Sequence, residues 1–178
     1  MARRKKTMAE LTRLTPAEFA TRPRLPLSLI LDDIRSANNV GSLFRTADCF
    51  ALRHVYLCGI TATPPHRDIL KTALGATQTI GWSYHESCLD LVRELRGAGT
   101  QVQCLEQTVG STPLRRYLPP AGVELAIVVG NEVRGVAQPV IDAADGCLEI
   151  EQFGTKHSLN VAVAGGMVVY QLRGRLVG

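Results

Sequence analysis

The stretch VELAIVVG, residues 123–130, decides the fold class of this 178-residue chain. After Glu124 the residues are apolar without a break until Gly130 ends the run. A strand with one solvated face alternates apolar and polar residues, whereas an unbroken apolar strand is typical of a parallel sheet covered on both faces. The stretch therefore predicts a buried central strand.

Shorter apolar segments on either side predict further strands at residues 27–31, 54–58, 79–84, 100–105 and 147–150. Between them, apolar residues at helical spacing predict helices over 39–51, 67–74, 87–96, 139–144 and 158–173. Strands that alternate with helices predict an α/β fold with a mainly parallel sheet flanked by helices.

The positive charge of the chain is concentrated in residues 1–24. This segment has seven basic and two acidic residues, a net charge of +5, whereas the whole chain carries +4. We therefore divide the chain into a basic arm, residues 1–24, and one domain, residues 25–178. A basic arm on a nearly neutral body favours a polyanionic partner such as RNA; the alternative is a solvated end without a partner.

The cysteine, histidine and hydropathy patterns argue against a disulfide-bonded, metal-binding, membrane-spanning or secreted protein. The five cysteines include no CxxC pair, and the four histidines are scattered, so we expect reduced cysteines and no metal site. No apolar stretch approaches the ~18 residues of a membrane span, and the first residues lack the apolar core of a secretory signal. We expect a cytoplasmic protein without a membrane partner.

Three polar clusters follow predicted strands: DDIRSANNVGSLFR at 32–45, GNEVRG at 130–135 and EQFGTKHSLN at 151–160. Ligands of open parallel sheets bind beyond the carboxyl ends of the strands, so one function could use all three clusters. In the first cluster, Asn38 or Asn39 is a candidate N-cap, Gly41 keeps the first turn thin enough for a ligand, and Arg45 could bind a phosphate. The alternative for Arg45 is a surface pair with Asp48.

In the second cluster, Gly130 lets the backbone approach a planar ligand, and Glu132 could bind a polar group or pair with Arg134. In the third, Ser158 is a candidate N-cap, and Asn160 would reach a ligand from the first helical turn. The helix that follows is apolar nearly all round. Such a helix is covered on more than one side, either by a second subunit or by its own monomer.

Together the clusters resemble the three signature motifs of the SpoU-type (TrmH-like) RNA 2′-O-ribose methyltransferases of the SPOUT class. The matching segments are NNVGSLFRTAD, IVVGNEVRGV and IEQFGTKHSLNVAVAGG, with KTALGA at residues 71–76 between them. The resemblance covers residues 27–173. The third motif often begins Ile-Pro-Met in the family, whereas this chain has Ile150-Glu151-Gln152.

The resemblance implies a homodimer with a C-terminal deep trefoil knot that methylates tRNA or rRNA with S-adenosylmethionine. The catalytic residues it implies are Asn39, Arg45, Glu132, Ser158 and Asn160. The donor-binding residues are Leu105, Glu106, Gly130, Asn131, Ile150, Ser158 and Leu159. No metal is implied.

The resemblance also implies that Arg45 acts at the reacting ribose, often in the partner subunit's site, as general base. Because arginine stays protonated in nearly every setting, an electrostatic clamp is the alternative role. Two further readings compete with the enzyme. A Rossmann-type oxidoreductase or methyltransferase would need a glycine-rich loop where SANNVGSLF stands. A catalytically inactive RNA-binding protein of the same fold would not need the intact motifs.

Overall fold

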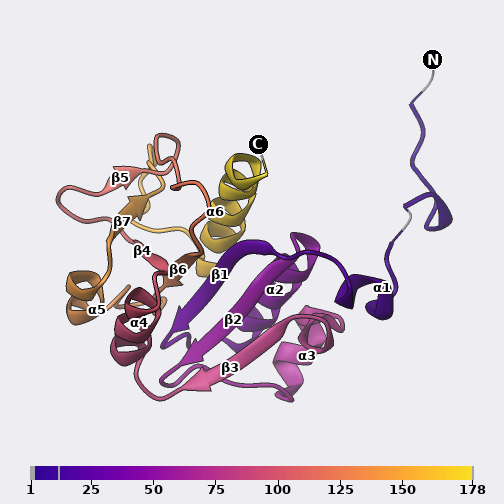
Figure 1. The fold of residues 1–178 in the computed structure, drawn as a ribbon, viewed down its shortest axis with the longest axis horizontal. Coiled ribbons are helices and arrows are strands. Elements are labelled where there is room, and N and C mark those ends of the chain that lie inside the picture. Colours follow the sequence, from indigo (N-terminus) through magenta and orange to yellow (C-terminus); the bar gives the residue numbers. More distant parts are fainter. Residues whose placement is uncertain (1–2, 12, 178) are drawn as a thin grey trace.

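The structure is a computed structural model, which describes residues 3–11 and 13–177. Its centre is a seven-stranded sheet with the strand order β3-β2-β1-β6-β4-β7-β5 (Figure 1). Every neighbouring pair of these strands is parallel. The strands are β1 (Leu25–Asp32), β2 (Leu52–Cys58), β3 (Gly81–His85), β4 (Gln101–Leu105), β5 (Thr112–Pro113), β6 (Leu125–Val129) and β7 (Gly146–Glu149). The predicted α/β class with a mainly parallel sheet is confirmed.

The stretch that suggested the fold forms β6, and it lies inside the sheet between β1 and β4. Its register with β1 runs from Leu27 opposite Leu125 to Leu31 opposite Val129. All its residues are buried. The unbroken apolar run is therefore explained, because both faces of β6 are covered and both edges are hydrogen-bonded.

Helices cover the two faces of the sheet. They are α2 (Ala37–Cys49), α3 (Arg67–Ala73), α4 (Cys88–Gly97), α5 (Gln138–Ala143) and α6 (Val161–Leu176). A short 3₁₀ helix, η2 (Ala76–Gln78), follows α3, whereas α1 (Pro16–Ala20) and the 3₁₀ helix η1 (Ala9–Leu11) lie in the segment before β1. On one face α2, α3 and α6 pack with Leu29 and Leu31 of β1, and on the other α4 and α5 pack with Ile30. Each face of β1 thus belongs to a different core.

Two helices begin at residues other than the predicted N-caps. Helix α2 is capped by Ser36, whose hydroxyl accepts from the Asn39 amide, instead of by Asn38 or Asn39. Helix α6 is capped by Asn160, whose side chain accepts from the amides of Ala162 and Val163 at 2.9 and 3.2 Å, instead of by Ser158. In both cases several Ser and Asn residues precede the helix, and N-cap preference does not rank these types against one another.

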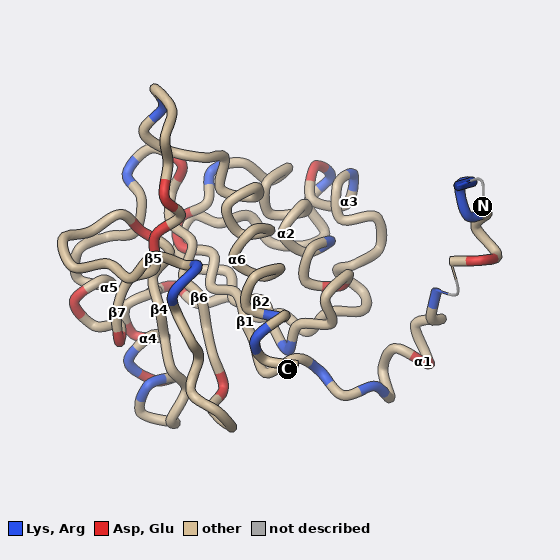
Figure 2. The backbone as a smooth tube through the Cα atoms, turned by 90° about the horizontal axis from the view of Figure 1, so that it is seen from above, with Lys and Arg blue, Asp and Glu red and all other residues tan. Residues whose placement is uncertain are grey.

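The segment before β1 leads away from the sheet (Figures 1 and 2). It contains α1, which begins with a capping box between Thr15 and Glu18, and Arg24 lies 3.7 Å from the centre of the Phe19 ring. Of the predicted basic arm, residues 1, 2 and 12 lie outside the described residues, as does residue 178 of the predicted domain. The first strand begins at Leu25, directly after the predicted arm.

The five cysteines are unpaired, as expected. Four are buried, whereas Cys49 at the end of α2 is exposed. In the described ranges, no group of three or more His, Cys, Asp or Glu side chains is arranged to hold a metal ion. No helix in the part of the chain that the structure describes has the length and apolar content to cross a membrane.

Candidate active site

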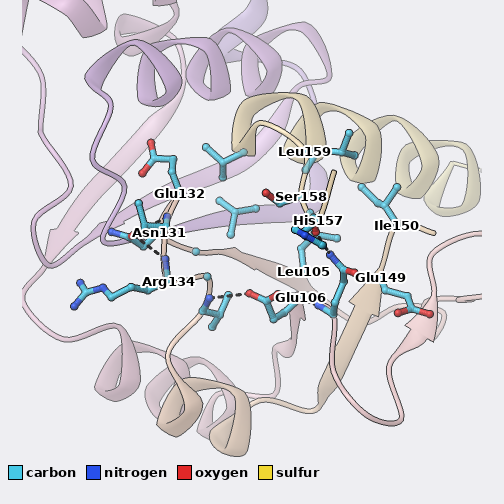
Figure 3. A pocket seen from close by; sticks show the side chains of 18 of the residues that line it. Leu105, Glu106, Asn131, Glu132, Arg134, Glu149, Ile150, His157, Ser158 and Leu159 are labelled. Carbon is cyan, nitrogen blue, oxygen red and sulfur yellow. Dashed lines mark hydrogen bonds between the residues drawn. The ribbon is translucent and has the colours of Figure 1, made fainter. Parts of the chain in front are cut away.

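A pocket of about 380 Å³ opens beyond the carboxyl ends of β4, β6 and β7 (Figure 3). Its wall combines the loop after β4, the loop after β6 and the segment between β7 and α6. The predicted donor-binding residues all line it: Leu105, Glu106, Gly130, Asn131, Ile150, Ser158 and Leu159. Glu132 lines it as well, whereas Asn39, Arg45 and Asn160 lie outside its wall.

The loop after β6 is folded by the buried side chain of Asn131. Its Oδ1 accepts from the amides of Val133 and Arg134 at 2.9 and 3.1 Å, and its Nδ2 donates to the carbonyl of Asp33 at 2.8 Å. Both ends of this amide are therefore occupied by protein groups. These bonds fix the side chain of Asn131 within its loop, which forms one wall of the pocket.

Gly130 is required by the same loop. A Cβ at this position would lie 2.3 Å from the carbonyl carbon of Gly135 and 2.3 Å from the amide of Val136. The close approach that we predicted for a ligand is therefore made first by the loop itself. This contact turns the chain after β6 back across the mouth of the pocket.

Two side chains after β4 tie the three loops together. Glu106 Oε2 accepts from the amide of Val136 at 2.9 Å, which joins the loop after β4 to the loop after β6. Gln107 Nε2 donates to the carbonyl of His157 at 2.8 Å, which joins it to the segment before α6. Gln107 and His157 both line the pocket. His157 belongs to the polar cluster at 151–160 that the sequence analysis singled out, whereas Gln107 was missed. Its position two residues after the predicted strand at 100–105 was the signal that could have selected it.

The carboxylate of Glu132 closes the N-terminus of α2. It accepts from the backbone amides of Arg35 at 2.8 Å and Ser36 at 3.0 Å, and from Asn39 Nδ2 at 2.9 Å. Burial by itself raises the pKa of Glu132, but these hydrogen bonds outweigh it and hold the pKa below its ordinary value. Glu132 is thus an anion that positions α2, and it has no ion pair with Arg134, which instead lies 3.5 Å from Asp33.

The network continues from Asn39 to Asn160. Asn160 Nδ2 donates to Asn39 Oδ1 at 3.2 Å, while Asn160 Oδ1 caps α6. The predicted place of Asn160 within the first helical turn is wrong, because Asn160 precedes the helix as its N-cap and its side-chain oxygen is used by the helix. Residues from all three motifs are nevertheless brought together in one hydrogen-bonded chain, Glu132 to Asn39 to Asn160.

Ser158 is not part of this hydrogen-bonded network. It is exposed at the pocket, and its hydroxyl forms no hydrogen bond with any residue that the structure describes. A hydroxyl in this state can still donate to or accept from a bound molecule. The whole hydrogen-bonding capacity of the Ser158 hydroxyl is therefore available to a molecule in the pocket.

Arg45 lies away from the pocket, exposed on α2, where it lines a second hollow of about 490 Å³. The hollow is bounded by α2 and α3, and its lining residues are Ser42, Arg45, Thr46, Cys49, Phe50, Lys71 and Thr72. The alternative pairing of Arg45 with Asp48 is not present, because Asp48 accepts from the hydroxyl of Thr79. Within one subunit, Arg45 and the pocket are thus two separate features.

Helix α2 approaches α3 more closely than a side chain on Gly41 would allow. A Cβ there would lie 2.1 Å from Thr72 Oγ1 and 2.4 Å from the carbonyl of Ile69. The thin first turn that we predicted to admit a ligand therefore admits α3 instead.

The model of the SpoU rRNA Methylase family matches residues 26–170. The 23S rRNA (guanosine(2553)-2′-O)-methyltransferase RlmP of Bacillus subtilis is 32% identical over 150 residues, which cover 82% of this chain and 57% of that protein. The 23S rRNA (guanosine-2′-O-)-methyltransferase RlmB of Neisseria meningitidis is 30% identical, covering 83% of this chain and 58% of that protein.

Among solved structures, an AdoMet-bound rRNA methyltransferase from Sinorhizobium meliloti superposes with a TM-score of 0.79 at 26% identity, covering 88% of this chain and 62% of that one. The chain thus spans a little over half the length of the two curated relatives.

Proposed function

The chain belongs to the SpoU rRNA methylase family, and from that premise we propose that it transfers a methyl group from S-adenosylmethionine to a ribose 2′-hydroxyl of transfer or ribosomal RNA. One observation carries this proposal. Residues of two motifs that are far apart in the sequence line a single pocket at the carboxyl edge of a parallel sheet, where such folds bind their ligands, and Asn39 of the remaining motif is hydrogen-bonded to both of them.

The pocket has the character that this donor requires. Its volume of about 380 Å³ lies in the range of small-molecule sites. Aliphatic side chains of Leu105, Ile150 and Leu159 offer apolar contact to a nucleoside and a thioether chain, and Ser158 offers a free hydroxyl. When bound, the sulfonium supplies an electrophilic methyl group, and this chain's residues have to hold it against the incoming hydroxyl.

Arg45 acts on the acceptor side of the reaction in this proposal. A guanidinium remains protonated near neutral pH, so it binds a phosphate and stabilises the negative charge that develops on the ribose oxygen. Asn39 lies six residues earlier on the same helix and is held by Glu132. Glu132 and Asn160 therefore act through the position of α2.

We propose that the active form is a homodimer in which Arg45 completes the site of the other subunit. Helix α6 exposes Val163, Met167 and Tyr170, the last with 70% of its surface accessible. Tyr170 packs edge-on against Phe50, with ring centres 6.2 Å apart, and Phe50 lines the hollow that contains Arg45. A second subunit that covers the apolar face of α6 therefore also contacts the hollow that contains Arg45.

Three further features belong to the same proposal. The C-terminal half carries the deep trefoil knot, which the contacts among the loops after β4 and β6 and before α6 support. The protein acts in the cytoplasm, where its RNA substrates occur, and requires no metal.

Residues 1–24 form an arm distinct from the domain at 25–178 and add RNA affinity through their charge. Deletion of residues 1–22 then reduces the dependence of RNA affinity on salt, and unaltered binding would exclude this role.

The central experiment combines donor-binding calorimetry with a labelled-methyl assay on RNA from cells that lack the gene. The wild-type protein should bind S-adenosylmethionine and methylate this RNA at ribose, and failure of both would refute the proposal. Donor binding without transfer would favour the inactive RNA-binding protein. Arg45→Ala should retain donor binding while transfer falls by orders of magnitude, and unchanged turnover would remove Arg45 from the reaction.

A mixing experiment tests whether Arg45 acts across the dimer. Subunits with Arg45→Ala retain an intact pocket, and subunits with Gly130→Ala retain Arg45. If Arg45 acts in the partner's site, the mixture should recover activity that neither variant has alone. If Arg45 and the pocket act together within one subunit, the mixture should recover no activity.

A further inference from the structure

The hollow between α2 and α3 contains a second cation that the proposed mechanism does not use. Lys71 of α3 lines it together with Arg45 of α2. Both residues are exposed, and neither forms a hydrogen bond or ion pair with the residues that the structure describes.

The packing of the two helices holds these cations on opposite sides of one hollow. Gly41 brings α2 against α3, and the hydroxyl of Thr72 donates to the carbonyl of Asn38 at 3.0 Å. The hydroxyl of Ser42 donates to the same carbonyl at 2.9 Å. The carbonyl oxygen of Asn38 thus joins α2 to α3. Because this contact fixes α3 against α2, it also fixes the position of Lys71 relative to Arg45.

The chemistry of the lining indicates the ligand. The seven lining residues include two cations and no carboxylate. The protons of Ser42 and Thr72 are already donated to Asn38, so the guanidinium and the ammonium are the principal donors for a ligand. Two like charges in one concave surface attract an anion that can accept from both.

We propose that Lys71 is a substrate-binding residue, which with Arg45 grips a backbone phosphate of the RNA next to the ribose to be methylated. This inference rests on the proposed function, because it takes RNA as the polyanion and Arg45 as the group beside the reacting ribose. It adds a contact that orients the strand by its backbone and carries no base information, since any nucleotide offers the same phosphate. Arginine binds such a group as a planar fork and lysine as a point charge.

The test compares Lys71→Ala, Lys71→Arg and a control, Arg93→Ala. Arg93 is an exposed cation on α4, which packs on the opposite face of the sheet. RNA affinity is measured by filter binding at several salt concentrations, with RNA from cells lacking the gene, and donor affinity is measured by calorimetry.

Lys71→Ala should weaken RNA binding roughly tenfold near 0.1 M salt and reduce the slope of log affinity against log salt by about 0.7 to 0.9, the value of one phosphate contact. Lys71→Arg should restore most of the affinity. Donor affinity should stay unchanged in every variant, and the KM for RNA should rise in Lys71→Ala more than kcat falls.

A salt slope equal to that of the wild type, or a loss no larger than in Arg93→Ala, would overturn the role of Lys71 while wild-type methylation still supports the proposed function. A wild-type protein that binds RNA without methylating it would remove the proposed function, and the slope of Lys71→Ala would still decide the phosphate contact. A wild-type protein that binds no RNA refutes the inference.

Discussion

Asn39 and Glu132 are separated by 93 residues, and the Asn39 side-chain amide donates to Glu132 Oε1 at 2.9 Å. The same carboxylate accepts hydrogen bonds from two backbone amides in the turn that precedes α2. Glu132 therefore does for α2 what an N-cap side chain does, but from a distant loop. The helix that carries Arg45 is thus positioned by a loop that forms one wall of the pocket.

Glu132→Gln should destabilise the protein by about 1 kcal/mol at pH 7, because an amide at a helix N-terminus lacks the charge of the carboxylate. The folded-state pKa of Glu132 lies below the ordinary value of 4.5. A depressed pKa contributes stability above the unfolded pKa, and this contribution is lost as pH falls through the folded pKa. The gap between wild type and variant should therefore be full above pH 5 and close under more acidic conditions.

Urea unfolding between pH 3 and pH 7 measures this gap. Glu94→Gln is the matched control, since Glu94 is exposed on α4 and has no hydrogen-bond partner among the described residues. A gap for Glu132→Gln that stays constant over this range would show that its charge does not stabilise α2.

The local sequence was sufficient to locate most strands and helices and to predict a mainly parallel sheet. The apolar runs at β1, β4 and β6 and the helical spacing in α2 and α4 depend on which faces are buried, and this pattern repeats along the chain. The edge strand β5 (Thr112–Pro113) was not predicted, because two residues paired only with β7 leave no periodic pattern. Proline is tolerated there because the strand is at the edge of the sheet.

The sequence predicted which loops form the site better than it predicted what each side chain does there. The motifs brought the right loops together, but the sequence does not say which polar atoms are used by the protein itself. Asn131 and Asn160 both have an amide side chain, yet the first is buried in its own loop and the second caps α6. The bonds from Asn131 to Asp33 and from Asn160 to Asn39, in contrast, join residues 98 and 121 positions apart, which no local pattern encodes.

Asn160 combines two roles that substitution can separate. Asn160→Ala removes the cap of α6 and should cost about 1 kcal/mol of stability. Asn160→Ser keeps a good capping oxygen but loses the donor to Asn39, so stability should stay within about 0.5 kcal/mol of the wild type. Thermal unfolding and the methyl-transfer assay are measured on both. If transfer falls in both variants, the bond to Asn39 matters for the reaction; full activity in Asn160→Ser would limit Asn160 to capping.

Gly130→Ala should disrupt the pocket. Its Cβ would stand 2.3 Å from backbone atoms of Gly135 and Val136, so the loop has to move, at a cost of about 1–3 kcal/mol. We expect donor affinity to fall at least tenfold by calorimetry, because this loop forms one wall. Gly174→Ala is the control: Gly174 lies in α6 with nothing within 4 Å of the added Cβ. It should stabilise the protein by about 0.5–1 kcal/mol. Wild-type donor affinity in Gly130→Ala would mean that the loop is not part of the donor site.

Met167→Glu tests the apolar face of α6. Met167 is 44% exposed, between the more exposed Val163 and Tyr170. If a second subunit covers this face, a carboxylate at its centre is buried without a partner, and the dimer should weaken at least a hundredfold. Sedimentation should then detect monomers that still bind the donor, since a single chain already forms the pocket. Methyl transfer should be lost because Arg45 no longer reaches a partner.

Val109→Glu is the matched control for this substitution, because Val109 is fully exposed in the loop after β4 and lies on none of the helices. It adds the same charge and should leave both the dimer and methyl transfer unchanged. If Met167→Glu sediments like the wild type, α6 is not the interface. If it is monomeric yet fully active, each subunit contains a complete site, and Arg45 has to reach the ribose within its own chain.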